Sequence, residues 1–156
     1  YGESQWSSLP GPDGVGVTFA FVGAPRDDGT RPMIQIVLVD LPTLLNEEAS
    51  TIPLEEFGGH MIGGIQRHQE NWTVQITDDQ LGQLRVKRYA WAGTSSTYPD
   101  VGLFENVHMR GIMYVGIDGD IGFSLRTQDF EQYAEVALPI GEYSIETFRL
   151  GITESK

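Results

Sequence analysis

The spacing of apolar residues changes abruptly within residues 54–92, and this change constrains the fold more than any other feature of the chain. From 54 to 67, apolar residues recur at intervals of three and four, as on one face of a helix. From 71 to 77 and from 84 to 92 they alternate with other residues, as in half-buried strands. Turn residues at 78–82 separate the two strands. We therefore predict a helix followed by an antiparallel hairpin. The predicted helical stripe consists of Leu54, Phe57, Met61, Ile62 and Ile65.

The predicted helix contains four glycines: Gly58, Gly59, Gly63 and Gly64. A glycine inside a helix costs about 0.8–1 kcal/mol relative to alanine. Packing must offset this cost, so we expect the glycines to let a strand or another helix approach closely. Two alternatives remain open, namely that they form a groove for a ligand or that the segment is not one regular helix.

The other periodic segments add more strands than helices. Strands are predicted at 15–22, 33–40, 107–117 and 120–127, with Asp118-Gly119 as a two-residue hairpin signal. Strands that are grouped, rather than alternating with helices, favour the α+β class, with a central antiparallel-rich sheet flanked by helices. We expect an extended N-terminal segment at 1–14, a single domain at 15–150 and a C-terminal tail at 151–156.

Three shorter helical segments are predicted outside 54–67. One is a helical turn at 44–49, one lies near 130–136, and another follows Pro139. The buried side of the last helical region is expected to consist of Ile140, Tyr143, Ile145 and Phe148.

Composition limits the classes of partner. The chain has 22 acidic and 10 basic residues, a formal charge of −12, and no cysteine. Nucleic-acid binding requires clustered Lys and Arg, so we expect no nucleic-acid partner, whereas the acidity suits a basic partner or simple solubility. Without cysteine there is no disulfide, thiol nucleophile or cysteine-bound metal. No apolar run approaches membrane-spanning length. The start at Tyr1, with no Met and no signal sequence, fits a mature exported protein or a trimmed chain.

No motif predicts catalysis or tight metal binding. There is no Gly-x-Ser-x-Gly nucleophile motif. His60 and His68 are too far apart to share a metal ion, and the loop Asp118-Gly-Asp120 lacks the further oxygens of a calcium site. We therefore expect no cofactor, no metal site and no enzymatic activity, and a hydrolase is the weakest of three functional hypotheses.

Short motifs occur along nearly the whole chain, including Pro12-Asp13-Gly14 before an aromatic strand, Leu54-Glu-Glu-Phe57, Ile65-Gln66, Arg88-Tyr89, Gly111-Ile-Met-Tyr114-Val115 and Ile145-Glu-Thr-Phe148-Arg-Leu150. Together these motifs resemble those of the Mog1/PsbP-like superfamily. This resemblance implies a central antiparallel sheet between helices, an α/β/α sandwich. Members include Ran-binding Mog1 proteins, PsbP subunits of photosystem II and exported bacterial proteins of obscure role, and the chain is most similar to the last group.

Four aromatic residues are candidates for a partner-binding surface. Tyr89 and Trp91 share one face of a predicted strand, and Tyr98 and Phe104 lie in a predicted polar loop. Such rings either belong to the core or act as exposed binding anchors.

The first hypothesis is therefore a non-enzymatic, exported bacterial protein that binds another protein or assists an envelope assembly. Its location would be periplasmic, extracellular or membrane-anchored through a removed N-terminal segment. The alternative is a small-molecule or ion carrier that uses a cleft between sheet and helix.

Overall fold

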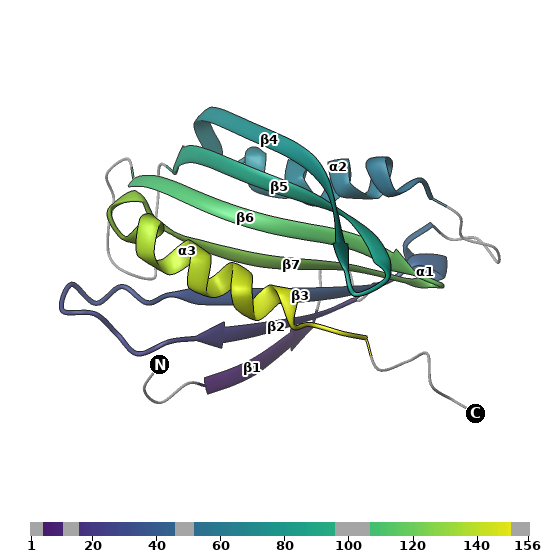
Figure 1. The fold of residues 1–156 in the computed structure, drawn as a ribbon, viewed down its shortest axis with the longest axis horizontal. Helices are drawn as coiled ribbons and strands as arrows, with labels where there is room; N and C mark the ends of the chain where they lie inside the picture. The colour runs from purple at the N-terminus through teal and green to yellow at the C-terminus, as the bar shows by residue number, and fades with distance from the viewer. Residues whose placement is uncertain (1–4, 11–15, 46–51, 96–106, 151–156) are drawn as a thin grey trace.

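The computed structural model describes residues 5–10, 16–45, 52–95 and 107–150 (Figure 1). Seven strands form one sheet in the order β1-β2-β3-β7-β6-β5-β4, and every neighbouring pair is antiparallel. The predicted α+β class with an antiparallel sheet is therefore confirmed. The elements are β1 (Gln5–Pro10), β2 (Gly16–Val22), β3 (Met33–Asp40), α1 (Leu41–Leu45), α2 (Leu54–Gln66), β4 (Gln69–Leu81), β5 (Leu84–Ser95), β6 (Val107–Asp118), β7 (Ile121–Phe130) and α3 (Glu131–Glu146).

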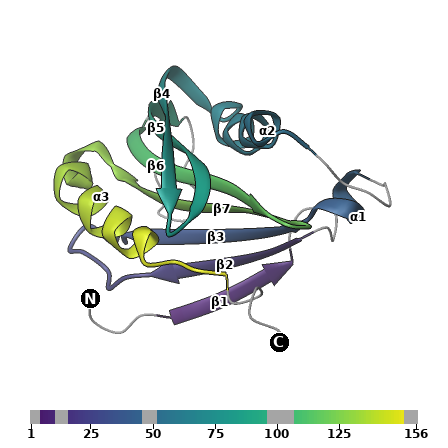
Figure 2. The same cartoon turned by 45° about the vertical axis from the view of Figure 1, so that its right-hand side comes forward.

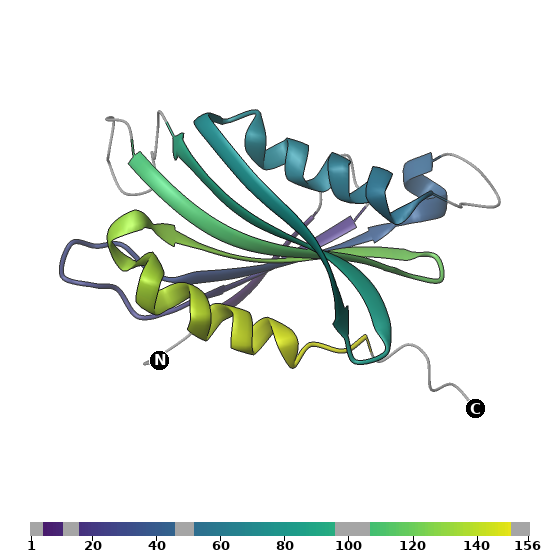
Figure 3. The same ribbon diagram turned by 45° about the horizontal axis from the view of Figure 1, so that its top comes forward.

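Helices α2 and α3 lie on opposite faces of the sheet (Figures 2 and 3). Successive side chains of β6 show this division, because Met113 and Val115 join the core beneath α2, whereas Ile112 and Tyr114 join the core beneath α3. Helix α3 packs mainly on β6 and β7. The outer strands β4 and β5 are therefore less covered on the α3 face.

Helix α2 confirms the helical prediction for 54–67, and its stripe faces the sheet. Phe57, Ile62 and Ile65 are buried, and Leu54 and Met61 pack against them at the margin. Pro53 precedes the first turn, where its missing N–H has no intrahelical partner in any case. The first turn also carries two glutamates, which the positive end of the helix dipole favours.

The prediction that the glycines of α2 act as spacers, which let another element approach closely, is confirmed at one position only. A Cβ atom at Gly58 would lie 2.0 Å from the Tyr89 hydroxyl oxygen, so glycine is needed there. A Cβ at Gly59 or Gly63 would meet no heavy atom within 4 Å, and one at Gly64 would meet only an Arg67 nitrogen at 3.8 Å. The spacer prediction is wrong for these three glycines, since nothing approaches the helix closely there.

Both hairpin turns lie further along the chain than predicted. Strand β4 continues through 78–80, and its turn consists of Gly82 and Gln83. The turn between β6 and β7 is Gly119-Asp120 rather than Asp118-Gly119. In each case glycine holds the first turn position, with φ of 63° at Gly82 and 60° at Gly119. A left-handed residue at that position suits the twist of a tight hairpin.

Strand β4 lies at the edge of the sheet. Its alternating pattern predicts one half-buried apolar face, but the edge position leaves some residues of that face exposed. Trp72 stacks on Trp91 with ring centroids 5.3 Å apart. Val74 and Ile76, further along, are both exposed. They pair in register with Trp91 and Tyr89 of β5, but α2 packs more on β5 and β6 than on β4, so the edge strand is less covered.

The C-terminal region forms one helix, α3, rather than two pieces separated at Pro139. The helix continues through Pro139 although proline there removes one intrahelical hydrogen bond, since the φ that proline fixes is compatible with a helix. Ile145 is buried and Phe148 packs on the same core, as predicted. Ile140 and Tyr143 are exposed, so their assignment to the buried side is wrong. The helical turn predicted at 44–49 begins earlier, at Leu41, and 46–49 lies outside the described residues.

None of the helices in the described ranges combines the length and apolar character needed to cross a membrane. Within the same ranges, no three His, Asp or Glu side chains are grouped so that they could hold a metal ion.

Candidate functional site on helix α3

The aromatic residues proposed as partner anchors are not on the surface where the structure describes them. Tyr89 and Trp91 are 2% and 3% exposed, because they lie on the face of β5 that α2 covers. Gly58 and Gly111 leave the space that the two rings occupy. The core alternative therefore holds for Tyr89 and Trp91, and their assignment to a partner surface is wrong. Tyr98 and Phe104 lie outside the described residues.

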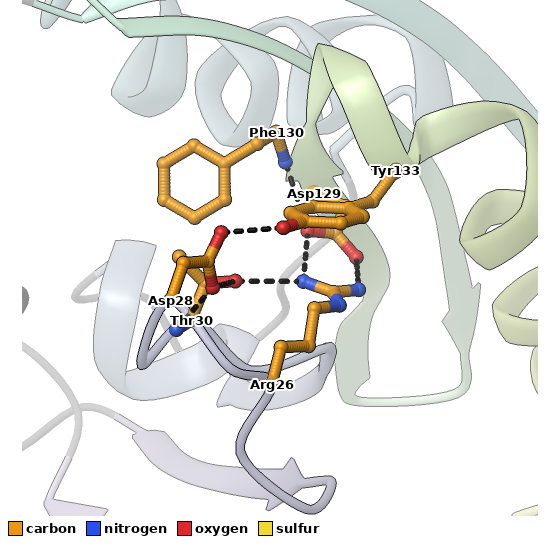
Figure 4. Close-up of polar contacts among 6 residues, drawn as sticks. All are labelled: Arg26, Asp28, Thr30, Asp129, Phe130 and Tyr133. Carbon is orange, nitrogen blue, oxygen red and sulfur yellow. Dashed lines mark hydrogen bonds and ion pairs between the residues drawn. The ribbon is translucent and has the colours of Figure 1, made fainter.

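The start of α3 is tied to the β2–β3 loop by a buried carboxylate (Figure 4). Asp129 is 3% exposed and binds the Arg26 guanidinium through both carboxylate oxygens, with Nη1 to Oδ1 at 2.9 Å. The Phe130 amide also donates to Asp129 Oδ1, at 2.9 Å. A bidentate pair of this kind restricts both partners to one geometry, so it fixes where α3 begins.

Tyr133 of α3 extends the same cluster (Figure 4). Its ring lies over the Arg26 guanidinium, 3.9 Å from centroid to Cζ, and its hydroxyl donates to Asp28. Asp28 also accepts from the Thr30 hydroxyl at 2.6 Å and the Thr30 amide at 2.9 Å. These hydrogen bonds, with that of the Thr30 side chain first and that of Tyr133 second, lower the pKa of Asp28 to about 2.

The second half of α3 is held by Glu142. Its carboxylate accepts from Arg88 Nε at 2.6 Å and from the Tyr114 hydroxyl at 2.9 Å. Burial, followed by the hydrogen bond to Glu142, raises the pKa of Tyr114, so its hydroxyl stays protonated and donates. The hydrogen bond to Glu142 also raises the pKa of Arg88. The helix is thus attached to the rest of the domain at both ends.

Once α3 is fixed in this way, one row of apolar side chains points away from the sheet. Val136, Ile140 and Tyr143 are 73%, 44% and 72% exposed, and their spacing of four and three residues places them on one helix face. We call these three residues the outer stripe. The acidic residues of α3 lie along one flank of this stripe: Glu131, Glu135, Glu142 and Glu146. The helix contains no Lys or Arg.

Sequence reasoning missed Val136 and placed the other two outer-stripe residues in the core. A signal was available, because Ala134, Leu138, Gly141 and Ile145 recur at four, three and four residues and form a complete inward stripe. All four are buried. A helix has room for only one stripe against a sheet, so the second apolar row must face solvent.

A groove lies between α3 and strands β4, β5 and β6, with a volume of about 820 Å³. Its floor is formed by small and apolar residues, including Ala90, Ala92 and Ile112, and its outer wall by Thr73 and Gln75 of β4. The α3 wall includes Glu135, Leu138, Pro139 and Glu142, and two arginines, Arg88 and Arg110, also line it.

No protein-family model matches this chain, and no curated protein matches its sequence.

Proposed function

We propose that this chain is a non-enzymatic binding protein that engages a protein partner through the outer stripe of α3. We further propose that the sheet and its two covering helices form a Mog1/PsbP-like α/β/α sandwich. The placement of α2 and α3 on opposite faces of an antiparallel sheet supports this assignment of the fold.

The exposure of the outer stripe is the observation that carries the proposed function. Single exposed apolar residues are ordinary, but Val136, Ile140 and Tyr143 lie in one row on a helix held at both ends. Apolar anchors at this spacing are the usual way in which a helix fills a groove on another protein. Because the helix is already ordered, binding would cost little additional conformational entropy.

Charge indicates the chemistry of the partner. The outer stripe is bordered on one side by the acidic flank of α3, and the chain as a whole carries −12. An apolar surface edged by Lys or Arg would complement this arrangement and would be steered toward it electrostatically. The partner is therefore a protein with a basic-edged apolar groove, rather than a second copy of this acidic chain.

Photo-crosslinking in cells that produce the protein tests the proposal. Benzoylphenylalanine at position 136 or 143 should give a discrete adduct with another protein, and Ile140→Lys should abolish that adduct. The control is the same probe at Ile76, which is exposed and apolar but lies on β4. Adducts of equal yield from position 76, adducts only between copies of this chain, or no adduct from position 136 or 143 would each refute the proposal.

A further inference from the structure

The groove beside α3 has the composition of a ligand site rather than of an incompletely filled core. Strand pairing places Thr73 beside Ala92 and Gln75 beside Ala90. These side chains are short or polar, whereas a part of the sheet covered by a helix would carry large apolar side chains. Arg110 and Ile112 continue the same two rows on β6. The resulting volume of about 820 Å³ lies within the range of pockets that hold small organic molecules.

Two arginines and two glutamates line the groove. One arginine and one glutamate are in contact with each other, whereas the other two, which we call the open pair, are not. Arg88 and Glu142 are in contact at 2.6 Å and hold α3 in place. Arg110 and Glu135 are both exposed, and neither forms a hydrogen bond or ion pair with any residue in the described ranges. Glu135 lies two helical turns, about 10 Å, from Glu142. The open pair therefore occupies a separate part of the groove.

A backbone acceptor lies beside the open pair. Pro139 has no N–H, so it cannot donate the usual helical hydrogen bond to the carbonyl of Glu135, four residues earlier. The α3 wall of the groove thus carries a carboxylate and a carbonyl that lacks its normal helical donor. An ammonium group can satisfy both acceptors at once.

We propose that the groove binds a free amino acid with a bulky apolar side chain. Its ammonium group binds Glu135 and its carboxylate binds Arg110 as a charge-assisted pair. Its side chain lies on the floor formed by Ala90, Ala92 and Ile112. A zwitterion matches this site better than a simple anion, because an anion would meet Arg110 but leave the carboxylate of Glu135 uncompensated.

Calorimetric titration with L-phenylalanine and two blocked forms tests this assignment. N-acetyl-L-phenylalanine lacks the ammonium charge, and L-phenylalaninamide lacks the carboxylate. Each blocked form should bind about tenfold or more weakly than L-phenylalanine, since each loses one charge-assisted contact. Ala90→Phe, which fills the floor, should abolish the binding of all three compounds.

Two variants should give a crossed pattern. Arg110→Gln should weaken the binding of L-phenylalanine about tenfold or more, but it should leave the affinity for L-phenylalaninamide unchanged. Glu135→Gln should weaken the binding of L-phenylalanine by a similar factor, but it should leave the affinity for N-acetyl-L-phenylalanine unchanged. Arg85→Gln and Glu146→Gln are matched controls, because these exposed residues do not line the groove. Neither should alter the affinity for L-phenylalanine.

Three results would overturn the assignment: no saturable binding of L-phenylalanine, equal binding of a blocked form, or equal effects of the groove and control variants. The test is independent of the partner surface. Ile140→Lys should leave the affinity for L-phenylalanine unchanged, and Arg110→Gln should leave crosslinking from position 143 unchanged. Failure of one proposal can therefore be told from failure of the other.

Discussion

The glycines of α2 differ in what surrounds them, and alanine substitution should separate them by sign. Gly58→Ala should lower the free energy of unfolding, because the new Cβ would lie 2.0 Å from the buried Tyr89 hydroxyl oxygen, and overpacking of this kind costs about 1–3 kcal/mol. Gly59→Ala and Gly63→Ala place Cβ in open space. Each should raise the free energy of unfolding by up to about 1 kcal/mol through helix propensity. Urea midpoints measure all three, and a higher midpoint for Gly58→Ala would contradict the close approach.

Asp28 should titrate near pH 2, because Thr30 and Tyr133 donate hydrogen bonds to its charged form. Its folded pKa lies below the unfolded value of about 3.9, so its contribution to stability is present above about pH 4 and is lost as pH falls toward 2. Carboxyl NMR titration measures this pKa. Thr30→Val should raise it more than Tyr133→Phe, since the Thr30 hydroxyl makes the largest contribution. A wild-type pKa near 3.9 would show that the cluster does not form.

Helix α3 carries two apolar stripes, and only one of them should affect stability. Leu138→Ala removes a buried side chain and should cost about 2–5 kcal/mol. Val136→Ala removes methyl groups from the solvent face and should change stability by no more than about 0.5 kcal/mol. Chemical denaturation measures both variants. A large loss for Val136→Ala would mean that the outer stripe is packed rather than free to bind.

The two long helices show what the sequence could and could not predict. Helix α2 has one apolar stripe, so its extent and its inward face followed from spacing alone. Helix α3 has two, and the choice between them depends on attachments far apart in sequence, such as Arg26 to Asp129 and Arg88 to Glu142. The candidate site depends on that choice, so local patterns could not locate it. Tyr89 and Trp91 were misassigned for a related reason, because only the packing of α2 shows which strand face is covered.

Across the whole molecule, protection of the sheet is concentrated in its centre. Strand β7 pairs with β3 on one side and β6 on the other, and most side chains of β6 and β7 are buried. Strand β4 pairs only with β5, and every residue from Glu70 to Gln80 is at least partly exposed. The sheet therefore joins a well-packed centre, which anchors both long helices, to an exposed edge that borders the groove.

Amide hydrogen exchange should follow this gradient. Amides of β6 and β7 should exchange slowest, at rates close to those set by global unfolding, because opening them requires both helices and two neighbouring strands to separate. Amides of β4 should exchange much faster, because every second N–H on an edge strand points away from the sheet and little apolar packing opposes local opening. Strands β4 and β6 have 13 and 12 residues, so length does not account for the difference. Exchange measured by NMR or mass spectrometry would contradict this organisation if β4 were protected as strongly as β7, since that result would require a covered or paired edge.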